Sequence, residues 1–157
     1  MEKYYQTMLN YIHQRPILKK IIFNITKFFP YITFCLYPCV LVYLYVNKSP
    51  EFLASILKPL GAFMTVTIFR KIINRPRPYE AMDIVPLKRH KSGESFPSRH
   101  AVSGMIIALI CLNANIYLGL FALVVATIMC ICRILAGVHY ISDVLAAIFI
   151  AIVFYII

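Results

Sequence analysis

The sequence has little negative charge and few charged residues of any kind. Only 6 of its 157 residues are Asp or Glu, against 16 Lys and Arg, and charged residues make up 14% of the chain. Hydrophobic residues make up 61%, and the mean hydropathy is +0.78. A soluble domain cannot bury that much apolar surface. The composition therefore excludes an ordinary soluble protein and indicates one that lies in a bilayer.

Three further features are not indicated by the sequence: a removable signal peptide, a structural disulfide and a metal site. The N-terminal segment has no apolar core followed by a small-residue cleavage site, so we expect no removable signal peptide. The 5 cysteines are odd in number and lie in apolar stretches, which argues against a structural disulfide. The acidic residues Glu80, Asp83 and Glu94 are scattered rather than paired, so the sequence predicts no metal site and no cofactor.

Apolar segments predict an all-α, polytopic transmembrane helical bundle with about five spans. Residues 1–29 mix aromatic and aliphatic residues with lysines, a pattern typical of amphipathic helices at the membrane interface. Residues 30–157 are expected to form the transmembrane core of a single domain, 1–157, with a polar, proline-rich loop at 74–98. The expected crossings are 31–46, which can extend back to residue 28, and then 52–73, 100–112, 116–135 and 140–157.

This topology brings two distant parts of the sequence to one membrane face. Because the tight turn at 113–115 lies on one side, the loop at 74–98 and the turn before His139 must lie on the other. The ionisable residues expected on that face are Arg70, Arg77, Arg99, His100, Arg133, His139 and Asp143. A charge within a span costs about 2.5–3.5 kcal/mol, so Arg133 and Asp143 need a partner or a water-filled site. A simpler alternative is that these two residues pair with each other.

The spacing of His139 and Asp143 is typical of a positioned imidazole. Four residues apart, they share one helical face, where the carboxylate can accept a hydrogen bond from one ring nitrogen. The other nitrogen would then keep a lone pair able to attack phosphorus. A purely structural histidine–aspartate cap is the alternative. Arg133 supplies a forked donor suited to phosphate oxygens. His13 and His90 are interpreted as surface histidines.

The polar loop and the start of the next helix offer further anion-binding groups. The prolines of the Arg-Pro-Arg-Pro segment at 75–78 hold the backbone extended, which preorganises the guanidinium groups. An ordinary basic loop beside a membrane span is the alternative interpretation. Ser98 is a candidate helix N-cap, and the amides that follow it can bind an anion. His100 at that position can give a proton to a departing oxygen.

Taken together, three motifs resemble the signatures of the type 2 phosphatidic acid phosphatase superfamily of lipid phosphatases. The family has a Lys, six residues and Arg-Pro; then Pro-Ser-Gly-His; then Ser-Arg, five residues, His, three residues and Asp. The matching residues here run from Arg70 to Pro78, from Pro97 to His100, and from Cys132 and Arg133 to His139 and Asp143. The resemblance covers nearly half of the chain. Arg70 stands in place of the family's Lys, Arg99 in place of Gly, and Cys132 in place of Ser.

The resemblance implies a role for each matching residue. His139 attacks the phosphorus, His100 protonates the leaving group and later activates water, and Asp143 orients His139. The residues implied to bind the substrate phosphate are Arg70, Arg77, Ser98, Arg99 and Arg133. A glycine in place of Arg99 would let phosphate approach the backbone, whereas a side chain there must turn away or join the ligands. We expect Arg99 to join them as an additional cation.

The partner implied is a lipid phosphate held among membrane lipids. Resemblance to bacterial enzymes suggests undecaprenyl diphosphate, phosphatidylglycerol phosphate or phosphatidic acid, and the sequence does not choose among them or give an oligomeric state. The alternative is a non-catalytic polybasic membrane protein that binds anionic headgroups. Nucleic-acid binding is disfavoured because the cations cluster at membrane boundaries. A soluble haloperoxidase of the same superfamily is excluded by hydrophobicity.

The side of the membrane that the site faces is indicated by two conflicting signals. Most of the positively charged residues that can indicate membrane orientation precede the first span: Lys3, Arg15, Lys19, Lys20 and Lys27. With five crossings these cations share the side of the loop at 74–98, so the positive-inside rule places that side in the cytoplasm. Interfacial helices can instead bind anionic lipids of either leaflet. Resemblance to the bacterial enzymes favours an extracytoplasmic site in a multi-pass cell-membrane protein, and this is our expectation.

Overall fold

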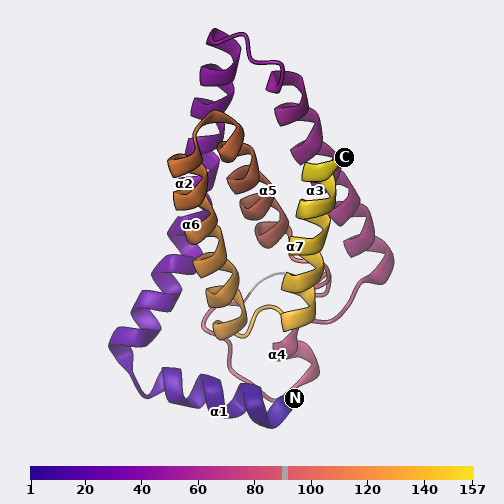
Figure 1. Cartoon of the computed structure of the whole chain (residues 1–157). Helices are drawn as coiled ribbons and strands as arrows, with labels where there is room; N and C mark the ends of the chain where they lie inside the picture. Colours follow the sequence, from indigo (N-terminus) through magenta and orange to yellow (C-terminus); the bar gives the residue numbers. More distant parts are fainter. Residues whose placement is uncertain (90–91) are drawn as a thin grey trace.

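A computed structural model describes residues 1–89 and 92–157, which form a bundle of apolar helices with a polar end (Figure 1). The helices are α1 (Glu2–His13), α2 (Pro16–Val46), α3 (Phe52–Ile73), the short α4 (Pro78–Ala81), α5 (Arg99–Ala114), α6 (Ile116–Leu135) and α7 (Ile141–Ile156). Among the described residues there is no strand. The expected all-α transmembrane bundle is confirmed. His90 lies outside the described residues.

Three of these helices, α2, α3 and α6, are long and apolar enough to cross a membrane. The other two bundle helices, α5 and α7, have 16 residues each. At 1.5 Å per residue such a helix is about 24 Å long, slightly short of the roughly 30 Å hydrocarbon core. Helix α5 packs against α2, α3, α6 and α7, and its buried residues include Val102, Ile106 and Ile110. It therefore forms the centre of the bundle.

The first crossing differs from the expected one at its N-terminal end. Helix α2 begins at Pro16 and continues through Pro30 and Pro38, so residues 17–29 are not a separate interfacial helix. A proline at the first helical position costs no hydrogen bond, which suits Pro16. Inside a membrane helix, a proline is tolerated when other donors satisfy the carbonyl that it frees. Pro59 of α3 shows this directly, because Tyr37 Oη donates to the freed carbonyl of Ser55 at 2.9 Å.

The helix ends have recognisable sequence signals. Asn74, with φ of 39°, ends α3 in the left-handed conformation that asparagine tolerates. Asn115 begins α6, and its side-chain oxygen accepts hydrogen bonds from the amides of Tyr117 at 2.9 Å and Leu118 at 3.1 Å. Gly137, with φ of 71°, makes the turn that leads from α6 to His139.

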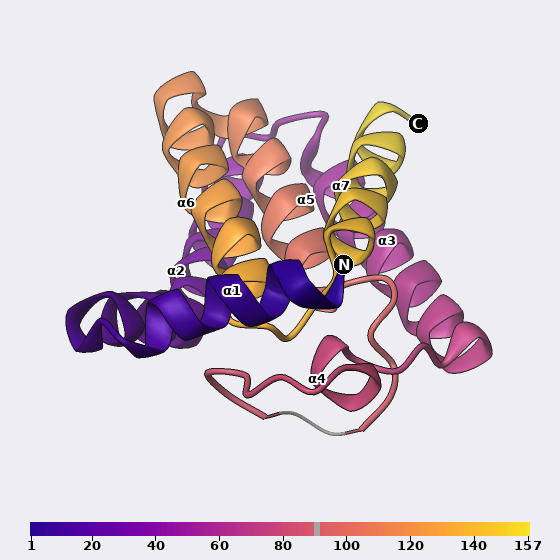
Figure 2. The ribbon, with the colours of Figure 1, turned by 90° about the horizontal axis from the view of Figure 1, so that it is seen from below.

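Helix α1 lies across the polar end of the bundle (Figure 2). Its buried side chains, Tyr5, Leu9 and Ile12, face the protein. The same end carries α4 and the polar loop, as Figures 1 and 2 both show. His13, at the end of α1, places Nε2 at 2.9 Å from the carbonyl of Val85 in that loop. The polar end is therefore assembled from the N-terminal helix and the loop in the middle of the sequence.

Candidate active site

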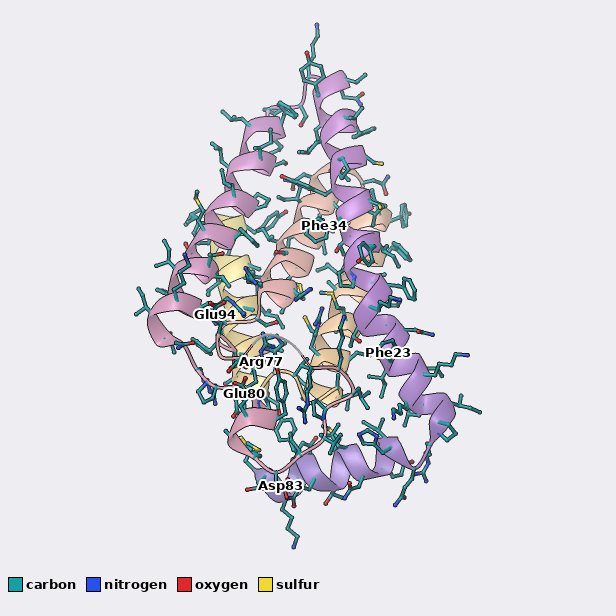
Figure 3. The ribbon with its side chains drawn as sticks, turned by 180° about the vertical axis from the view of Figure 1, so that it is seen from behind. Phe23, Phe34, Arg77, Glu80, Asp83 and Glu94 are labelled. Carbon is teal, nitrogen blue, oxygen red and sulfur yellow. The ribbon has the colours of Figure 1, made fainter. Side chains whose placement is uncertain are left out.

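The polar loop is held in shape by the carboxylate of Glu80. Its Oε2 accepts hydrogen bonds from the amide of Arg77 at 2.7 Å and from the amide of Gly93 at 3.0 Å. Burial alone would raise the pKa of Glu80, but these amide hydrogen bonds outweigh it and lower the pKa. Figure 3 shows Arg77, Glu80 and Glu94 close together at this end of the molecule. One carboxylate thus ties α4 to the far side of the loop.

Two hydrogen bonds fasten the returning segment of the loop to the end of α3. Asn74 Oδ1 accepts a hydrogen bond from the amide of Glu94 at 3.2 Å. The amide of Ser95 donates to the carbonyl of Arg75 at 2.9 Å. A third contact, from the amide of Leu87 to the carbonyl of Ala136 at 3.0 Å, fastens the loop to the turn after α6. The loop therefore covers the ends of α3 and α6.

Beneath the loop lies a cavity of about 120 Å³, which we call the catalytic cavity because the predicted catalytic residues His100 and His139 line it. It is lined by Arg70, Arg77, Ser92, Gly93, Glu94, Arg99, His100, Arg133 and His139. A water molecule occupies about 30 Å³ in the liquid, so the space suits a group of several oxygens such as a phosphate. Six of the eight site residues expected from the sequence line this cavity. The sequence topology had placed them on one face, and the structure brings them together.

Three of the guanidinium groups at the cavity are buried and anchored on backbone carbonyls. Arg70 is 4% exposed and donates to the carbonyl of Pro97 at 3.0 Å. Arg77 is 6% exposed and donates to the carbonyl of Val138 at 3.2 Å. Arg70 also lies 3.7 Å from the Glu94 carboxylate, and its Nε has no hydrogen-bond partner among the described residues. A buried donor of this kind suits an anionic ligand.

Arg133 is anchored on a carbonyl that a proline sets free. Its Nη2 donates to the carbonyl of Thr26 at 3.4 Å, although the two residues are far apart in sequence. In a regular helix that carbonyl would accept the amide hydrogen of residue 30. Residue 30 is a proline inside α2, and proline has no such hydrogen. The interruption in α2 thus provides the acceptor that holds Arg133 beside the cavity.

His139 and Asp143 make the expected contact. His139 Nδ1 lies 3.4 Å from Asp143 Oδ2, and the two residues are 2% and 0% exposed. Asp143 also acts as a cap, because the same oxygen accepts the amide hydrogen of Tyr140 at 2.9 Å. The catalytic and structural interpretations of this pair are therefore compatible. With Nδ1 directed at the carboxylate, Nε2 is the nitrogen left for the cavity that the ring lines.

Sequence reasoning missed two further partners of Asp143. Ser95 Oγ donates to Asp143 Oδ2 at 2.5 Å, and Arg75 Nη1 donates to Oδ1 at 2.9 Å. The guanidinium carbon of Arg75 also lies 3.9 Å from the ring centroid of Tyr140. Arg75 therefore provides the cation of the Asp143 ion pair, and the simpler alternative of an Arg133–Asp143 pair is wrong. The Arg-Pro-Arg-Pro segment supplies one arginine to the carboxylate and one to the cavity.

A third missed residue, Tyr5, comes from α1. Its hydroxyl donates to the backbone carbonyl of His139 at 3.2 Å, and its ring lies edge-on to Tyr140 with centroids 6.3 Å apart. Leu9, one turn further on, lies against the turn at Gly137, where an added Cβ would be 3.0 Å from Leu9 Cδ1. No local sequence signal marks Tyr5. It is 134 residues from its partner.

The residues that begin α5 take different positions. Ser98 is the N-cap residue, as expected, but its side chain makes no capping hydrogen bond and it does not line the cavity. Its amide donates to the carbonyl of Asp143 at 3.1 Å, so it links α5 to α7. Arg99 is exposed and His100 is half-buried, and both line the cavity. The expected contribution of Ser98 to phosphate binding therefore stays a prediction.

Burial controls the protonation of His139. Desolvation is the largest effect and lowers its pKa to about 4, against the opposing influence of Asp143. The cations Arg77 and Arg133 also lower the pKa. The imidazole is thus neutral at pH 7, which is the form with a nucleophilic lone pair.

The fold and site define a polytopic membrane protein with a cationic, phosphate-sized cavity and a neutral imidazole in its wall. Comparison with known proteins identifies its family. A model of the PAP2 superfamily matches residues 51–157, more than half of the chain, and the chain belongs to this family. A membrane lipid phosphatase is the class of enzyme that this membership supports. Among curated proteins no sequence match was found.

Two solved structures share the fold. Aquifex aeolicus LpxE superposes with a TM-score of 0.77 at 23% identity, over 98% of this chain and 91% of LpxE. A transmembrane PAP2-type phosphatidylglycerolphosphate phosphatase from Bacillus subtilis superposes with a TM-score of 0.64 at 23% identity. That match covers 90% of this chain and 75% of the Bacillus protein. At such identities the likeness concerns the fold alone.

The freed carbonyl in α2 predicts opposite effects on stability and activity. Pro30→Ala restores the amide hydrogen that can bond to Thr26, so the helix should become more stable while Arg133 loses its acceptor. We expect a higher melting temperature in detergent together with a KM for lipid phosphate raised about tenfold, since a charged hydrogen bond contributes about 1.5–3 kcal/mol. Pro38→Ala is the matched control and should raise stability only. Unchanged KM in Pro30→Ala would contradict the anchoring of Arg133.

The lowered pKa of His139 predicts acid sensitivity. In the unfolded chain a histidine binds a proton near pH 6.5, whereas folded His139 resists protonation down to about 4. The unfolded state therefore binds more protons between these values, and stability falls as the pH falls. The largest expected contribution is about 3 kcal/mol. Thermal unfolding between pH 8 and pH 4 should show a steeper loss in wild type than in His139→Gln. Parallel curves would refute the assignment.

Proposed function

We propose that this protein is a lipid phosphate phosphatase that uses His139 as its nucleophile and forms a phosphohistidine. The observation that carries the proposal is the convergence of four arginines and two histidines on a phosphate-sized cavity. Asp143 holds Nδ1 of His139, so Nε2 attacks the terminal phosphorus of the substrate. The cavity arginines stabilise charge on the three oxygens that remain bound to that phosphorus.

His100 acts as an acid in the first step of the reaction and as a base in the second. As the phosphorus–oxygen bond to the lipid breaks, His100 gives its proton to the departing oxygen. Water then gives a proton back to His100 while its oxygen bonds to phosphorus and the nitrogen–phosphorus bond breaks, which releases inorganic phosphate. The arginines supply the positive charge that metal ions supply in other phosphoryl-transfer sites, so we propose that the reaction needs no metal.

A line of connected cavities supports a lipid substrate. The junction cavity, of about 230 Å³, shares Arg99 and His100 with the catalytic cavity. The tail groove, of about 360 Å³, shares Phe34, Phe63 and Ser103 with the junction cavity. In Figure 3, α2 and α3 meet at one end and splay apart toward the loop, with Phe34 between them. A lipid tail in the groove would place its headgroup beside His100.

The phosphoenzyme is the test of this proposal. Brief incubation with a lipid phosphate labelled on its terminal phosphorus, followed by quenching, should leave acid-labile, base-stable label on the protein. We expect at least a hundredfold less phosphate release and no label in His139→Gln, and more label in His100→Gln because water attack is impaired. His13→Gln changes a histidine outside the catalytic cavity and should behave like wild type. The label should persist in EDTA.

Two results would contradict the mechanism. Label on His139→Gln equal to that on wild type would exclude His139 as the nucleophile. Release that stops in EDTA and resumes with magnesium would exclude a reaction driven by arginines alone. A protein that binds lipid phosphate without releasing phosphate would support the non-catalytic headgroup binder instead.

We also propose that the catalytic cavity faces the extracytoplasmic side of a cell membrane. The cations of residues 1–29 that lie on the loop side, among them Lys19, Lys20 and Lys27, are exposed on helix surfaces next to that end of the bundle. Such cations can bind anionic headgroups of either leaflet, so they do not fix the orientation. Recycling of a carrier lipid would require an outward site.

The orientation predicts the labelling of one exposed residue. Ser92 lies in the loop over the catalytic cavity and is exposed. In a variant without the native cysteines, Ser92→Cys should react with a membrane-impermeant maleimide in intact cells, before lysis. Labelling that appears only after lysis would place the cavity in the cytoplasm. The cysteine-free parent measures the background.

A further inference from the structure

Arg99 differs from the other arginines of the catalytic cavity in its surroundings. Arg70, Arg77 and Arg133 are 4%, 6% and 3% exposed and are hydrogen-bonded to backbone carbonyls. Arg99 is exposed and, within residues 1–89 and 92–157, makes no hydrogen bond or ion pair. Its charge is felt by the neighbours, because repulsion from Arg99 adds to burial in lowering the pKa of Arg77. Arg99 is therefore a cation available to a ligand.

The position of Arg99 is the boundary between two cavities. It lines the catalytic cavity, where the terminal phosphate would lie against His139, and the junction cavity, which leads to the tail groove. His100, the next residue of α5, lines the same two cavities. A substrate with its terminal phosphate in the catalytic cavity and its tail in the groove would pass these two residues. Arg99 thus lies beside the place of the group attached to the terminal phosphate.

The charge of the catalytic cavity favours a highly charged ligand. Among the described residues, its wall carries four guanidinium groups, from Arg70, Arg77, Arg99 and Arg133, and one carboxylate, from Glu94. A phosphate monoester carries about 1.5 to 2 negative charges at pH 7. A lipid diphosphate adds a further negative charge at the inner phosphate, on the side toward the tail. The fourth arginine lies at that side.

The chemistry of the leaving group also favours a lipid diphosphate. When a lipid monophosphate is cleaved, an alkoxide leaves and needs a full proton from His100. When a lipid diphosphate is cleaved, the bridging oxygen leaves on the inner phosphate, and the developing charge spreads over its oxygens. The second pKa of a phosphate is near 6, so this group needs stabilisation by a cation more than protonation. A planar, forked guanidinium suits adjacent phosphate oxygens.

We propose that Arg99 forms a subsite for the inner phosphate and makes lipid diphosphates the preferred substrates. The proposal rests on the proposed function and specifies its substrate class. In the reaction, His139 bonds to the outer phosphorus, the bridging oxygen departs with the inner phosphate as a lipid monophosphate, and water later releases the outer phosphate. The family motif that this segment resembles, Pro-Ser-Gly-His, has glycine at this position. Glycine has no side chain that could form such a subsite.

The test compares two substrates that share one tail, farnesyl diphosphate and farnesyl monophosphate, in detergent. We expect kcat/KM of the wild-type protein to favour the diphosphate. Arg99→Gly should lower kcat/KM for the diphosphate at least tenfold more than for the monophosphate, and Arg99→Lys should lie between, because a point charge replaces the fork. Arg89→Gly, which removes an exposed loop arginine outside these cavities, is the matched control and should keep the wild-type ratio. Thermal unfolding checks that each variant is folded.

The outcomes separate this inference from the proposed function. Equal losses on both substrates in Arg99→Gly, or inactivity on both in a folded protein, would overturn the subsite, because Arg99 would then serve the outer phosphate. A wild-type preference for the monophosphate would overturn it as well. Failure of the wild-type protein to release phosphate from either substrate would instead contradict the proposed phosphatase.

Discussion

The mutual repulsion of buried arginines is the constraint on which this structure depends. Arg70, Arg77 and Arg133 are each desolvated, and each donates to a backbone carbonyl. These carbonyls lie where regular helix bonding is interrupted: before α5, in the turn after α6, and opposite a proline in α2. Carbonyls that lack an amide partner are strong acceptors, so such interruptions are favourable places to bury a cation beside a membrane span. The irregular backbone therefore determines where positive charge can be concentrated.

The same requirement explains why the site extends beyond the region that the family model matches. The three motifs lie within residues 51–157, but their supports come partly from the first 50 residues. Tyr5 of α1 contacts the carbonyl of His139, and Thr26 of α2 accepts from Arg133. These two contacts position the proposed nucleophile His139 and Arg133, a proposed phosphate ligand. The N-terminal segment is thus part of the active-site framework.

Much of the site could be predicted because its logic is local or topological. The spacing of His139 and Asp143 predicted their contact, although His139 lies in the turn before α7 and not on a face of that helix. The alternation of spans predicted that the loop and the turn after α6 lie together. The predicted start of the first crossing was wrong because a proline such as Pro30 usually marks a helix boundary in a soluble protein. In this membrane helix, a side-chain donor satisfies the carbonyl that the proline leaves unbonded. Arg75 and Ser95 were missed as partners of Asp143 because their contacts depend on how the loop folds back.

The packing of like charges also determines which ligands the cavity favours. Among the described residues, four arginines and one carboxylate line a small cavity, and hydrogen bonds to backbone carbonyls hold Arg70 and Arg77 there. Repulsion that is relieved only when an anion enters favours the bound state, and it favours most strongly the state with the most negative charge. In phosphoryl transfer that charge is spread over the equatorial, attacking and leaving oxygens. The anchored arginines and Arg99, which makes no ion pair among the described residues, therefore act in the same direction, because both favour ligands of high negative charge.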